Sequence, residues 1–440
     1  LLELMIDLYE AGDYAQGITL AEKWVEQQNV SRQEDIYPLV YYYIAYGYQN
    51  LHGKENTEQT NHYMTVYVTL GENAVADGCF PHRTEDYIVL KSLAEDYYLD
   101  MVYYYLGCLL YDRRAYGEAI ADYEEAARRY PDFPTVHRNL ALAYYNVKKQ
   151  PQRAYEEMEK AFALDETDAR VYLELDQLKK RLNVPVKERW SDMEKYFDLV
   201  ESRDDLYLEY VTLLNTLGEN AKALDLIMVR KFHQWEGGEG KVAAQYLTAL
   251  YQLAKAAVAK EDYAEAKELL LRAVDEYPHN LGEGKLESAQ ENNLYYLLGL
   301  VQEKLGETEE AFVNLTKACY GESEPVGMMY YNDQPPEMIY YQGLAYRKLG
   351  DEEQAVQRFC KLVDYGKEHI GDEIKIDYFA VSLPDLLIFE EDLKERNRKH
   401  CLFMMSLGLK GLGRTDEAEK CAQQLLAMDN AHQGIRVHDL

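Results

Sequence analysis

Small and large apolar residues recur along the chain at fixed spacings. Gly107 is followed by Ala119, Tyr123, Ala126 and Pro131, at offsets of 12, 16, 19 and 24. The pattern starts again, in full or in part, at other anchor residues, which are Met5, Ala141, Val211, Ala254, Gly299, Gly343 and Ser406. This spacing predicts pairs of antiparallel helices, because the small anchor and the small residue after it can meet where two helices cross closely.

Glycine and proline mark the ends of these predicted helices. A glycine stands seven residues after five of the anchors, at Gly12, Gly218, Gly306, Gly350 and Gly413. Glycine tolerates the left-handed conformation with which many helices end, so these residues are expected to end the first helix of each pair. Pro131 and Pro278 are expected to close second helices, since proline cannot continue one.

Residues 103–134, YYYLGCLLYDRRAYGEAIADYEEAARRYPDFP, give the clearest copy of the pattern. They resemble a tetratricopeptide repeat, and about eight such units can be followed along the chain. The resemblance implies an all-α fold, an α-solenoid of helix pairs over residues 1–440. We expect divergent pairs in 1–100, the copies closest to the consensus in 101–200, and repeats with long inter-repeat insertions in 201–440.

The insertions follow the second helix of each pair in the last part of the chain. An ideal repeat has about 34 residues, whereas the anchors from Val211 to Ser406 are 43, 45, 44 and 63 residues apart. The inserted segments include FHQWEGGEGK at 232–241, YPHNLGEGK at 277–285 and YYNDQPPEM at 330–338. Because they fall at one structural place, they are expected to project from one edge of the solenoid. The two Gly-Glu-Gly-Lys sequences should occupy equivalent places.

Aromatic rings beside carboxylates and amides are typical of a groove for a sugar or a peptide. The candidate residues for binding a ligand or partner are His233, Trp235, Glu236, Glu239, Lys241, Glu283, Lys285, Tyr330, Tyr331, Asn332 and Asp333. In a sugar site, Trp235 would stack on the ring while Glu236, Glu239, Glu283 or Asp333 bonded hydroxyls. The plainer interpretation is structural: the glycines form turns, Trp235 fills a gap between repeats, and Asp333 caps the helix that Pro336 begins.

Charge and cysteine content narrow the classes of partner and compartment. The formal net charge of −31 argues against nucleic acid, whose phosphates would be repelled. No apolar run reaches the length of a membrane span, so no membrane partner is expected. The six cysteines are dispersed and form no Cys-x-x-Cys pair, which favours a reducing, cytoplasmic setting.

Motifs for catalysis, metal binding and cofactor binding are not found in the sequence. It contains no His-Glu-x-x-His, no Cys/His ligand spacing, no Gly-x-Ser-x-Gly and no dinucleotide fingerprint. The Gly-rich segment at 237–241 also lacks the Ser or Thr that a phosphate-binding loop needs after its lysine. We therefore expect no enzyme activity, no catalytic residue, no metal and no cofactor in this chain.

Several segments outside the repeat pattern carry a second resemblance. They are FPHRTED at 80–86, FPTVHRNLALAYYN at 133–146, WEGGEGK at 235–241, YYNDQPPEM at 330–338 and SLPDLLIFEEDL at 382–393. Together they resemble the C-terminal repeat region of large bacterial proteins whose helices follow a β-rich, galactose-mutarotase-like domain of unknown function. The resemblance implies that the chain is the helical part of a larger, carbohydrate-related protein, and Leu1 already lies within a helical pattern.

Two functions follow as hypotheses. The first is a protein-interaction scaffold that binds a protein or peptide partner, such as the preceding domain of the same polypeptide. The alternative is the helical part of a carbohydrate-active or carbohydrate-binding protein whose inserted loops help to form a glycan site. The second hypothesis requires the two Gly-Glu-Gly-Lys loops and the 330–338 loop to converge on one cleft.

Overall fold

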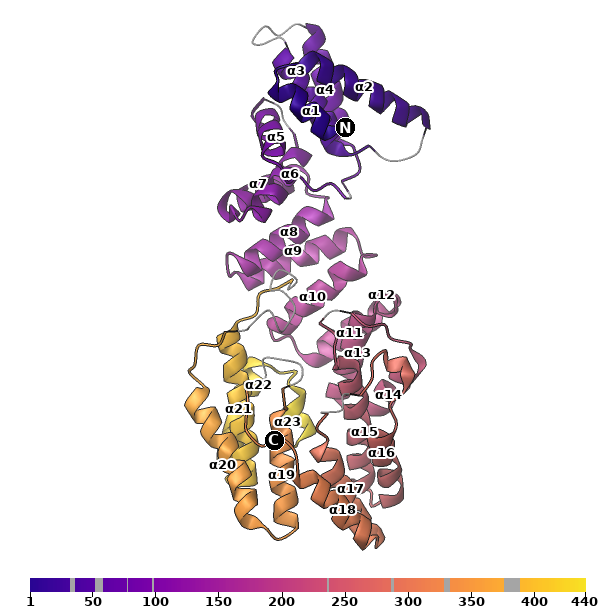
Figure 1. The fold of residues 1–440 in the computed structure, drawn as a ribbon, viewed down its shortest axis with the longest axis vertical. Helices are drawn as coiled ribbons and strands as arrows, with labels where there is room; N and C mark the ends of the chain where they lie inside the picture. Colours follow the sequence, from indigo (N-terminus) through magenta and orange to yellow (C-terminus); the bar gives the residue numbers. More distant parts are fainter. Residues whose placement is uncertain are drawn as a thin grey trace. The chain divides into compact units, whose positions relative to one another are not determined.

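The computed structural model describes residues 1–31, 36–51, 58–76, 78–96, 99–235, 237–285, 289–327, 333–375 and 388–440. These residues form an all-α fold of 23 α-helices and one 3₁₀-helix (Figure 1). The chain divides into two compact units, Leu1–Glu166 and Thr167–Leu440, which we call the N-terminal and C-terminal units. The predicted all-α solenoid of helix pairs is confirmed within each unit.

The N-terminal unit is built from helix pairs, with α5 packed between α3 and α6. The pairs are α1 with α2, α3 with α4, α6 with α7, and α8 with α9. The helices are α1 (Leu2–Glu10), α2 (Tyr14–Ser31), α3 (Pro38–Leu51), α4 (Glu58–Glu72), α5 (Thr84–Asp96), α6 (Met101–Asp112), α7 (Tyr116–Arg129), α8 (Pro134–Asn146) and α9 (Pro151–Leu164).

The C-terminal unit continues with longer connections between pairs. Its first helices are α10 (Ala169–Arg181), α11 (Val186–Lys195), α12 (Phe197–Ser202), α13 (Asp204–Leu217) and α14 (Asn220–Val229). The next pairs are α15 (Lys241–Ala259) with α16 (Tyr263–Asp275), and α17 (Asn292–Leu305) with α18 (Thr308–Cys319), separated by η1 (His279–Leu281). The last helices are α19 (Pro336–Lys348), α20 (Glu352–His369), α21 (Leu393–Gly411), α22 (Thr415–Met428) and the short α23 (Gln433–Val437).

The repeated spacing has a direct physical cause in both units. The large residue 16 positions after a glycine anchor lies against that glycine: Tyr123 against Gly107, and Phe359 against Gly343. A Cβ added to either glycine would lie 2.5 Å from the ring, closer than real Cβ contacts come. The anchor must therefore be small where the second helix carries a large apolar residue.

The predicted helix ends are also confirmed. The five glycines seven residues after an anchor all have positive φ, between 74° and 91°. Arg114 and Glu261 occupy the same turn after Gly107 and Ala254, with φ values of 61° and 59°. The helix-pair geometry therefore imposes the left-handed turn even where the sequence supplies no glycine.

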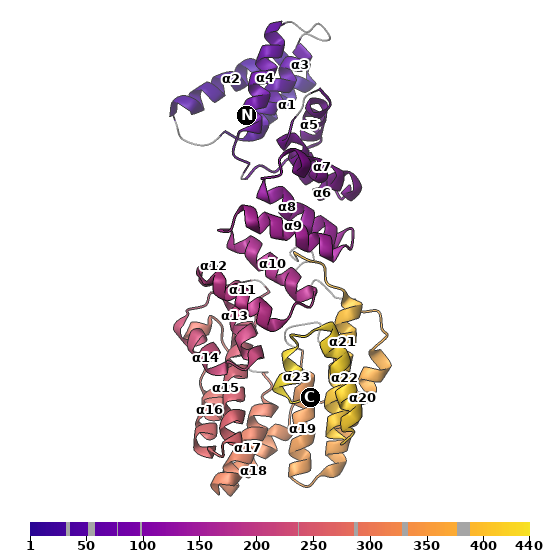
Figure 2. The ribbon, with the colours of Figure 1, turned by 180° about the vertical axis from the view of Figure 1, so that it is seen from behind.

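The short helix α23 lies among the first helices of the C-terminal unit. Both ribbon views place it between α13 and α15 on one side and α19 and α21 on the other (Figures 1 and 2). We call residues Asn430–Asp439 the strap, and the helix faces of α13, α15, α19 and α21 that it contacts the inner face.

Candidate binding site

The two Gly-Glu-Gly-Lys loops pack directly on one another. Each follows the second helix of a pair and precedes the first helix of the next, as the equivalent spacing predicted. The backbone N–H of Phe232 donates to the carbonyl of Asn280 at 2.9 Å, and the Asn280 side chain donates to the carbonyls of Ile227 and Arg230. Gly282, with φ of +81°, is close enough to Phe232 that a Cβ there would lie 2.7 Å from its carbonyl oxygen.

A cavity of about 320 Å³ lies between these loops. It is lined by His233, Gln234, Trp235, Gly238, Glu239, Val242, Leu281, Gly282 and Glu283. Trp235 is half-buried, and its indole ring lies against Gly238, where any side chain would collide with it. The loops thus bring together four predicted candidates: His233, Trp235, Glu239 and Glu283.

Two of these polar candidates already have structural partners. Glu283 accepts hydrogen bonds from the backbone N–H of Gly240 at 2.7 Å and of Ala243 at 3.3 Å, at the N-terminus of α15. A carboxylate there satisfies free N–H groups and favours the helix dipole. His233 bonds Asp204 through its backbone N–H and its Nδ1, at 2.9 and 3.1 Å. Glu283 therefore holds the two loops together, and His233 holds the first loop to the start of α13.

Of the other described candidates, Lys241, Lys285 and Asp333 do not line this cavity. Lys285 bonds Glu291 at 2.6 Å, and Lys241 is exposed at the first position of α15. Asp333 lies within electrostatic range of Tyr365 and His400. The N-cap of α19 is Pro335, so the expectation that Asp333 caps this helix is wrong. Glu236, Tyr330, Tyr331 and Asn332 lie outside the described residues.

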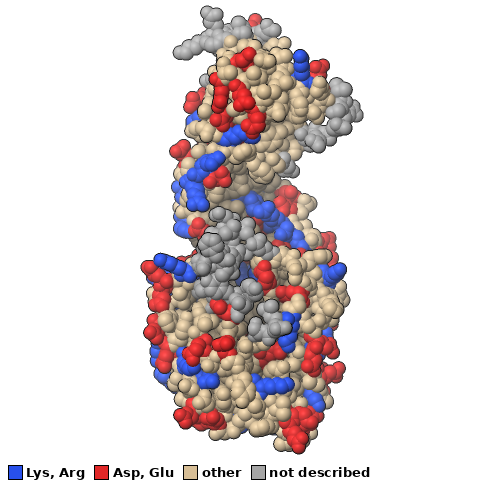
Figure 3. All heavy atoms as spheres, in the orientation of Figure 1, with Lys and Arg blue, Asp and Glu red and all other residues tan. Residues whose placement is uncertain are grey.

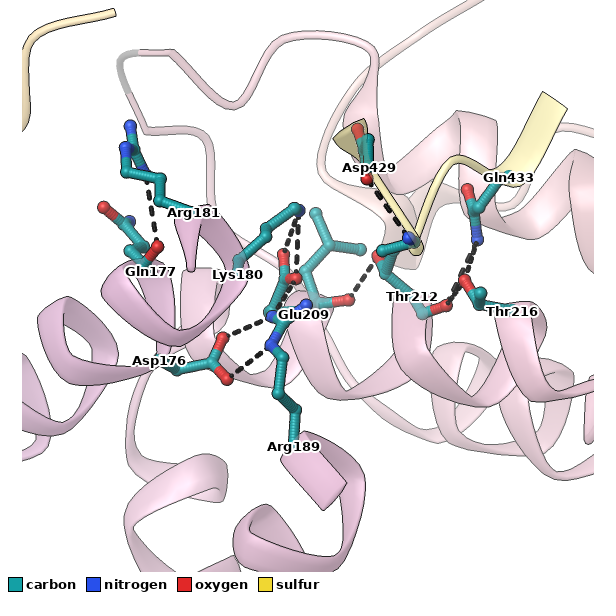
Figure 4. A network of polar contacts seen from close by, with 12 residues as sticks. Asp176, Gln177, Lys180, Arg181, Arg189, Glu209, Thr212, Thr216, Asp429 and Gln433 are labelled. Atoms are coloured by element: carbon teal, nitrogen blue, oxygen red, sulfur yellow. Dashed lines mark hydrogen bonds and ion pairs between the residues drawn. The ribbon is translucent and has the colours of Figure 1, made fainter. Parts of the chain in front are cut away.

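The inner face holds the strap through side chains that reach main-chain groups. The amide of Gln433 donates to the carbonyl of Thr212 and the hydroxyl of Thr216, both at 3.1 Å (Figure 4). Arg436 donates to the carbonyl of Thr216 at 3.0 Å. Gln245 of α15 also bonds the Gln433 side chain, at 2.9 Å. The strap is thus fixed to carbonyl and hydroxyl groups of α13 and to a side-chain amide of α15.

Two lysines, one on each side of the strap, bind its C-terminal end. Lys255 of α15 donates to the carbonyl of Val437 at 2.8 Å and to the carboxylate of Asp439 at 2.7 Å. Lys410 of α21 donates to the carbonyl of His438 at 3.1 Å and to that of Asp439. These bonds to main-chain carbonyls depend little on which side chains the bound segment carries.

His438 is the most deeply placed polar side chain of the strap. It is 6 % exposed, and its Nδ1 lies 3.0 Å from the hydroxyl of Tyr341, which in turn bonds the hydroxyl of Tyr251 at 2.8 Å. Burial, followed by the positive charge of Lys255, lowers the pKa of His438 to about 3. The imidazole is therefore neutral on the inner face at neutral pH.

A buried ionic cluster supports α13 next to the inner face (Figure 4). Arg189 of α11 is 1 % exposed and bonds Asp176 of α10 through two nitrogens, at 3.0 and 2.6 Å. It also bonds Glu209 of α13 at 2.7 Å, and Lys180 bonds the same carboxylate at 3.1 Å. Burial opposes ionisation of Glu209, but Lys180 and Arg189 outweigh it and hold its pKa well below the usual range. Three helices are therefore tied together one turn before Thr212.

Acidic side chains are scattered over the visible face of each unit and interspersed with basic ones (Figure 3). All six cysteines are free thiols. Among the described residues, no group of three or more His, Cys, Asp or Glu side chains is arranged to hold a metal ion. No described helix has both the length and the apolarity to cross a membrane.

The sequence patterns did not predict that the strap lies on the inner face. The available signal was polar residues within strongly apolar first helices: Thr212 and Thr216 are four apart in α13, and Lys255 interrupts the apolar part of α15. A residue spacing of four places both threonines on one helix face. The sequence could not show which segment lies on that face.

Helix pairs with this spacing define a repeat protein of the solenoid class. Family models described as tetratricopeptide repeat match residues 104–169, 248–280, 293–320 and 337–365. The chain therefore carries tetratricopeptide repeats in these four segments.

Solved structures of other proteins show limited similarity to the chain. The Naa15/Naa10 complex bound to HypK-THB matches with 12 % identity and a TM-score of 0.34, covering 98 % of this chain and 64 % of that one. The human IFIT1 dimer with m7Gppp-AAAA matches with 13 % identity and a TM-score of 0.30, covering 97 % and 88 %. YrrB, described as a TPR protein with an unusual peptide-binding site, matches with 16 % identity and a TM-score of 0.21, covering 56 % and 98 %. The chain thus spans less than two thirds of the first of these proteins.

Proposed function

We propose that the chain is a protein-interaction scaffold and that the inner face of its C-terminal unit binds a polypeptide segment of a protein partner. The observation that carries this proposal is the strap, because this face already holds a stretch of polypeptide. A preceding domain of the same polypeptide is one such partner.

The chemistry of the inner face suits a peptide. Lys255 and Lys410 offer charged donors to main-chain carbonyls, while Thr212, Thr216 and Gln245 offer neutral acceptors and donors. Tyr251 and Tyr341 supply rings with hydroxyl groups, which combine apolar contact with hydrogen bonding. A segment bound here would have its polar main chain satisfied on the protein, as burial requires.

A peptide library displayed on phage tests this function. Peptides selected on the folded chain should, when resynthesised with a photo-reactive group, cross-link to α13, α15, α19 or α21. Mass spectrometry of the proteolysed product locates the cross-link, and a scrambled peptide is the control. Cross-links confined to α16, α18, α20 or α22 would place binding on another face, and a failure to select any peptide would count against a scaffold role.

The cavity between the two Gly-Glu-Gly-Lys loops favours a second candidate function, binding of a sugar by these two loops alone. No described residue of the 330–338 loop lines the cavity, so the three-loop form of the hypothesis has no support here. Its supporting observation is that Trp235 and Glu239 face one cavity of about 320 Å³ formed by two loops 44 residues apart in sequence. A half-buried indole can stack on the apolar face of a sugar ring while carboxylates bond its hydroxyls. This candidate assigns the inserted loops, rather than the inner face, to ligand recognition.

Substitution of Trp235 by Ala is the sharpest test of the sugar site. If the cavity binds sugar, the chain should bind members of a glycan array, and Trp235→Ala should weaken that binding at least tenfold. Trp190→Phe serves as the matched control, since Trp190 lies in α11 and not among the residues that line this cavity. Equal glycan binding by the natural chain and Trp235→Ala, or no binding by either, would refute the candidate.

A further inference from the structure

The strap is held mainly by polar contacts rather than by a core of its own. Ile435, at 3 % exposed, and His438 are its buried residues, while most of the others are half-buried or exposed. Its only helix, α23, has five residues. A helix of that length has too few hydrogen bonds to be stable by itself. The strap therefore owes its conformation to the surface on which it lies.

The inner face fits the strap closely at one point. Gly434 lies so near the Phe403 ring of α21 that a Cβ there would come within 2.5 Å of it. The neighbouring Ile435 is buried, and Gln433 makes the hydrogen bonds to α13 and α15. The inner face thus contacts three consecutive strap residues in different ways. Gln433 makes hydrogen bonds, Gly434 leaves room for the Phe403 ring, and Ile435 is a buried apolar anchor.

Asn430 fixes the place where the strap leaves the repeats. Its backbone N–H donates to the side chain of Asn183 at 2.7 Å, and its amide donates to the carbonyl of Asn183 at 2.6 Å. Asn183 in turn donates to the carbonyl of Ala427 at the end of α22. The strap is tethered beside its binding surface, so its effective concentration there is high, on the order of millimolar for a short flexible connection.

We propose that the strap is an intramolecular ligand of the inner face, which competes with partner segments that carry a Gln-Gly-Ile-like sequence in a short helical turn. This inference rests on the proposed function, since it concerns the occupancy of the same face. The donors that bind the strap, above all Lys255 and Lys410, bind main-chain carbonyls and would serve an incoming segment equally well. A partner must displace the strap, which lowers its apparent affinity.

The first test uses a fluorescein-labelled peptide of residues 429–440 and fluorescence anisotropy. A chain from which residues 429–440 are deleted should bind this peptide, and the full chain should bind it at least tenfold more weakly. Lys255→Ala/Lys410→Ala in the deleted chain should abolish binding. Lys267→Ala should not, because Lys267 bonds Glu307 and makes no contact with the strap. A folded deletion variant that fails to bind the peptide overturns the inference.

The second test keeps the chain at full length and so does not depend on the deletion variant being folded. Ile435→Asp places a charge in the buried anchor position and should expel the strap, raising the affinity for inner-face peptides at least tenfold. Val313→Asp makes the same kind of change at a residue of α18 that is 51 % exposed and should have no effect. Equal affinities of Ile435→Asp and the natural chain would show that the strap does not compete, while cross-links to the inner face would leave the proposed function standing.

Discussion

Replacing Phe359 with Ala is expected to lower the free energy of unfolding of the C-terminal unit by about 3–5 kcal/mol, the range for loss of a large aromatic side chain from a core. Phe359 is fully buried in α20 and is enclosed by Gly343 of α19 and Gly411 of α21. Glycines cannot move side chains into the space left behind, so the cavity would stay open. Urea denaturation followed by Trp fluorescence in a Trp24→Phe background measures this, because Trp190 and Trp235 then both report on the C-terminal unit.

Phe312 provides the matched control. It lies in α18, also within a second helix, but is 62 % exposed, so Phe312→Ala should change the free energy of unfolding by no more than about 0.5 kcal/mol. Both substitutions bring the same change in helix propensity, so the difference between their effects on the free energy of unfolding reports the contribution of burial. If Phe359→Ala lowered the free energy of unfolding by less than about 1 kcal/mol, the packing of this ring between α19 and α21 would not be a main source of stability.

The packing of Phe359 against Gly343 could be predicted from the sequence. Gly343, Ala355, Phe359 and Leu362 follow the offsets found first at Gly107, and all four are buried. Repeated offsets are informative because each copy meets the same packing requirement, so chance agreement becomes rare as copies accumulate. The same reasoning located the helix ends at the five glycines, whereas the equivalent turn at Glu261 was not predicted, because the sequence has no glycine there.

The loops could be predicted only in part. Equal spacing indicated that the two Gly-Glu-Gly-Lys segments follow equivalent helices, and the structure brings them together around Trp235. The partners of Glu283 could not be foreseen, because its bonds to Gly240 and Ala243 join segments about 40 residues apart. A loop sequence records which backbone shapes are possible, but the contacts that select one of them come from distant elements.

The strap and the ionic cluster were beyond sequence reasoning for a related reason. Nothing local distinguishes Asp176 and Glu209 from the other carboxylates of so acidic a chain, since their burial results from the packing of three helices. Gln433 likewise meets Thr212 across more than two hundred residues. Periodicity predicts which face of a helix is covered, but it does not identify the distant segment that covers it.

Replacing Arg189 with Ala is expected to destabilise the C-terminal unit by about 3–5 kcal/mol, because it would leave the buried carboxylate of Asp176 without its charged partner. Arg414→Ala removes an exposed ion pair with Glu417 and should leave the stability nearly unchanged, because water and salt screen such a pair.

The double substitution Asp176→Leu/Arg189→Met distinguishes the contribution of charge to stability from the contribution of packing. It removes both charges of the most buried pair and leaves Glu209 paired with Lys180, so most of the lost stability should return. If the double variant is as unstable as Arg189→Ala, the cluster acts through packing rather than through charge.

Loss of the cluster should also weaken binding of the 429–440 peptide to the chain lacking those residues, because Glu209 lies one turn before Thr212 on α13. Restoration of stability in the double variant should restore this binding. The buried charges would then contribute to recognition by holding α13 in the position from which Thr212 and Thr216 receive the strap.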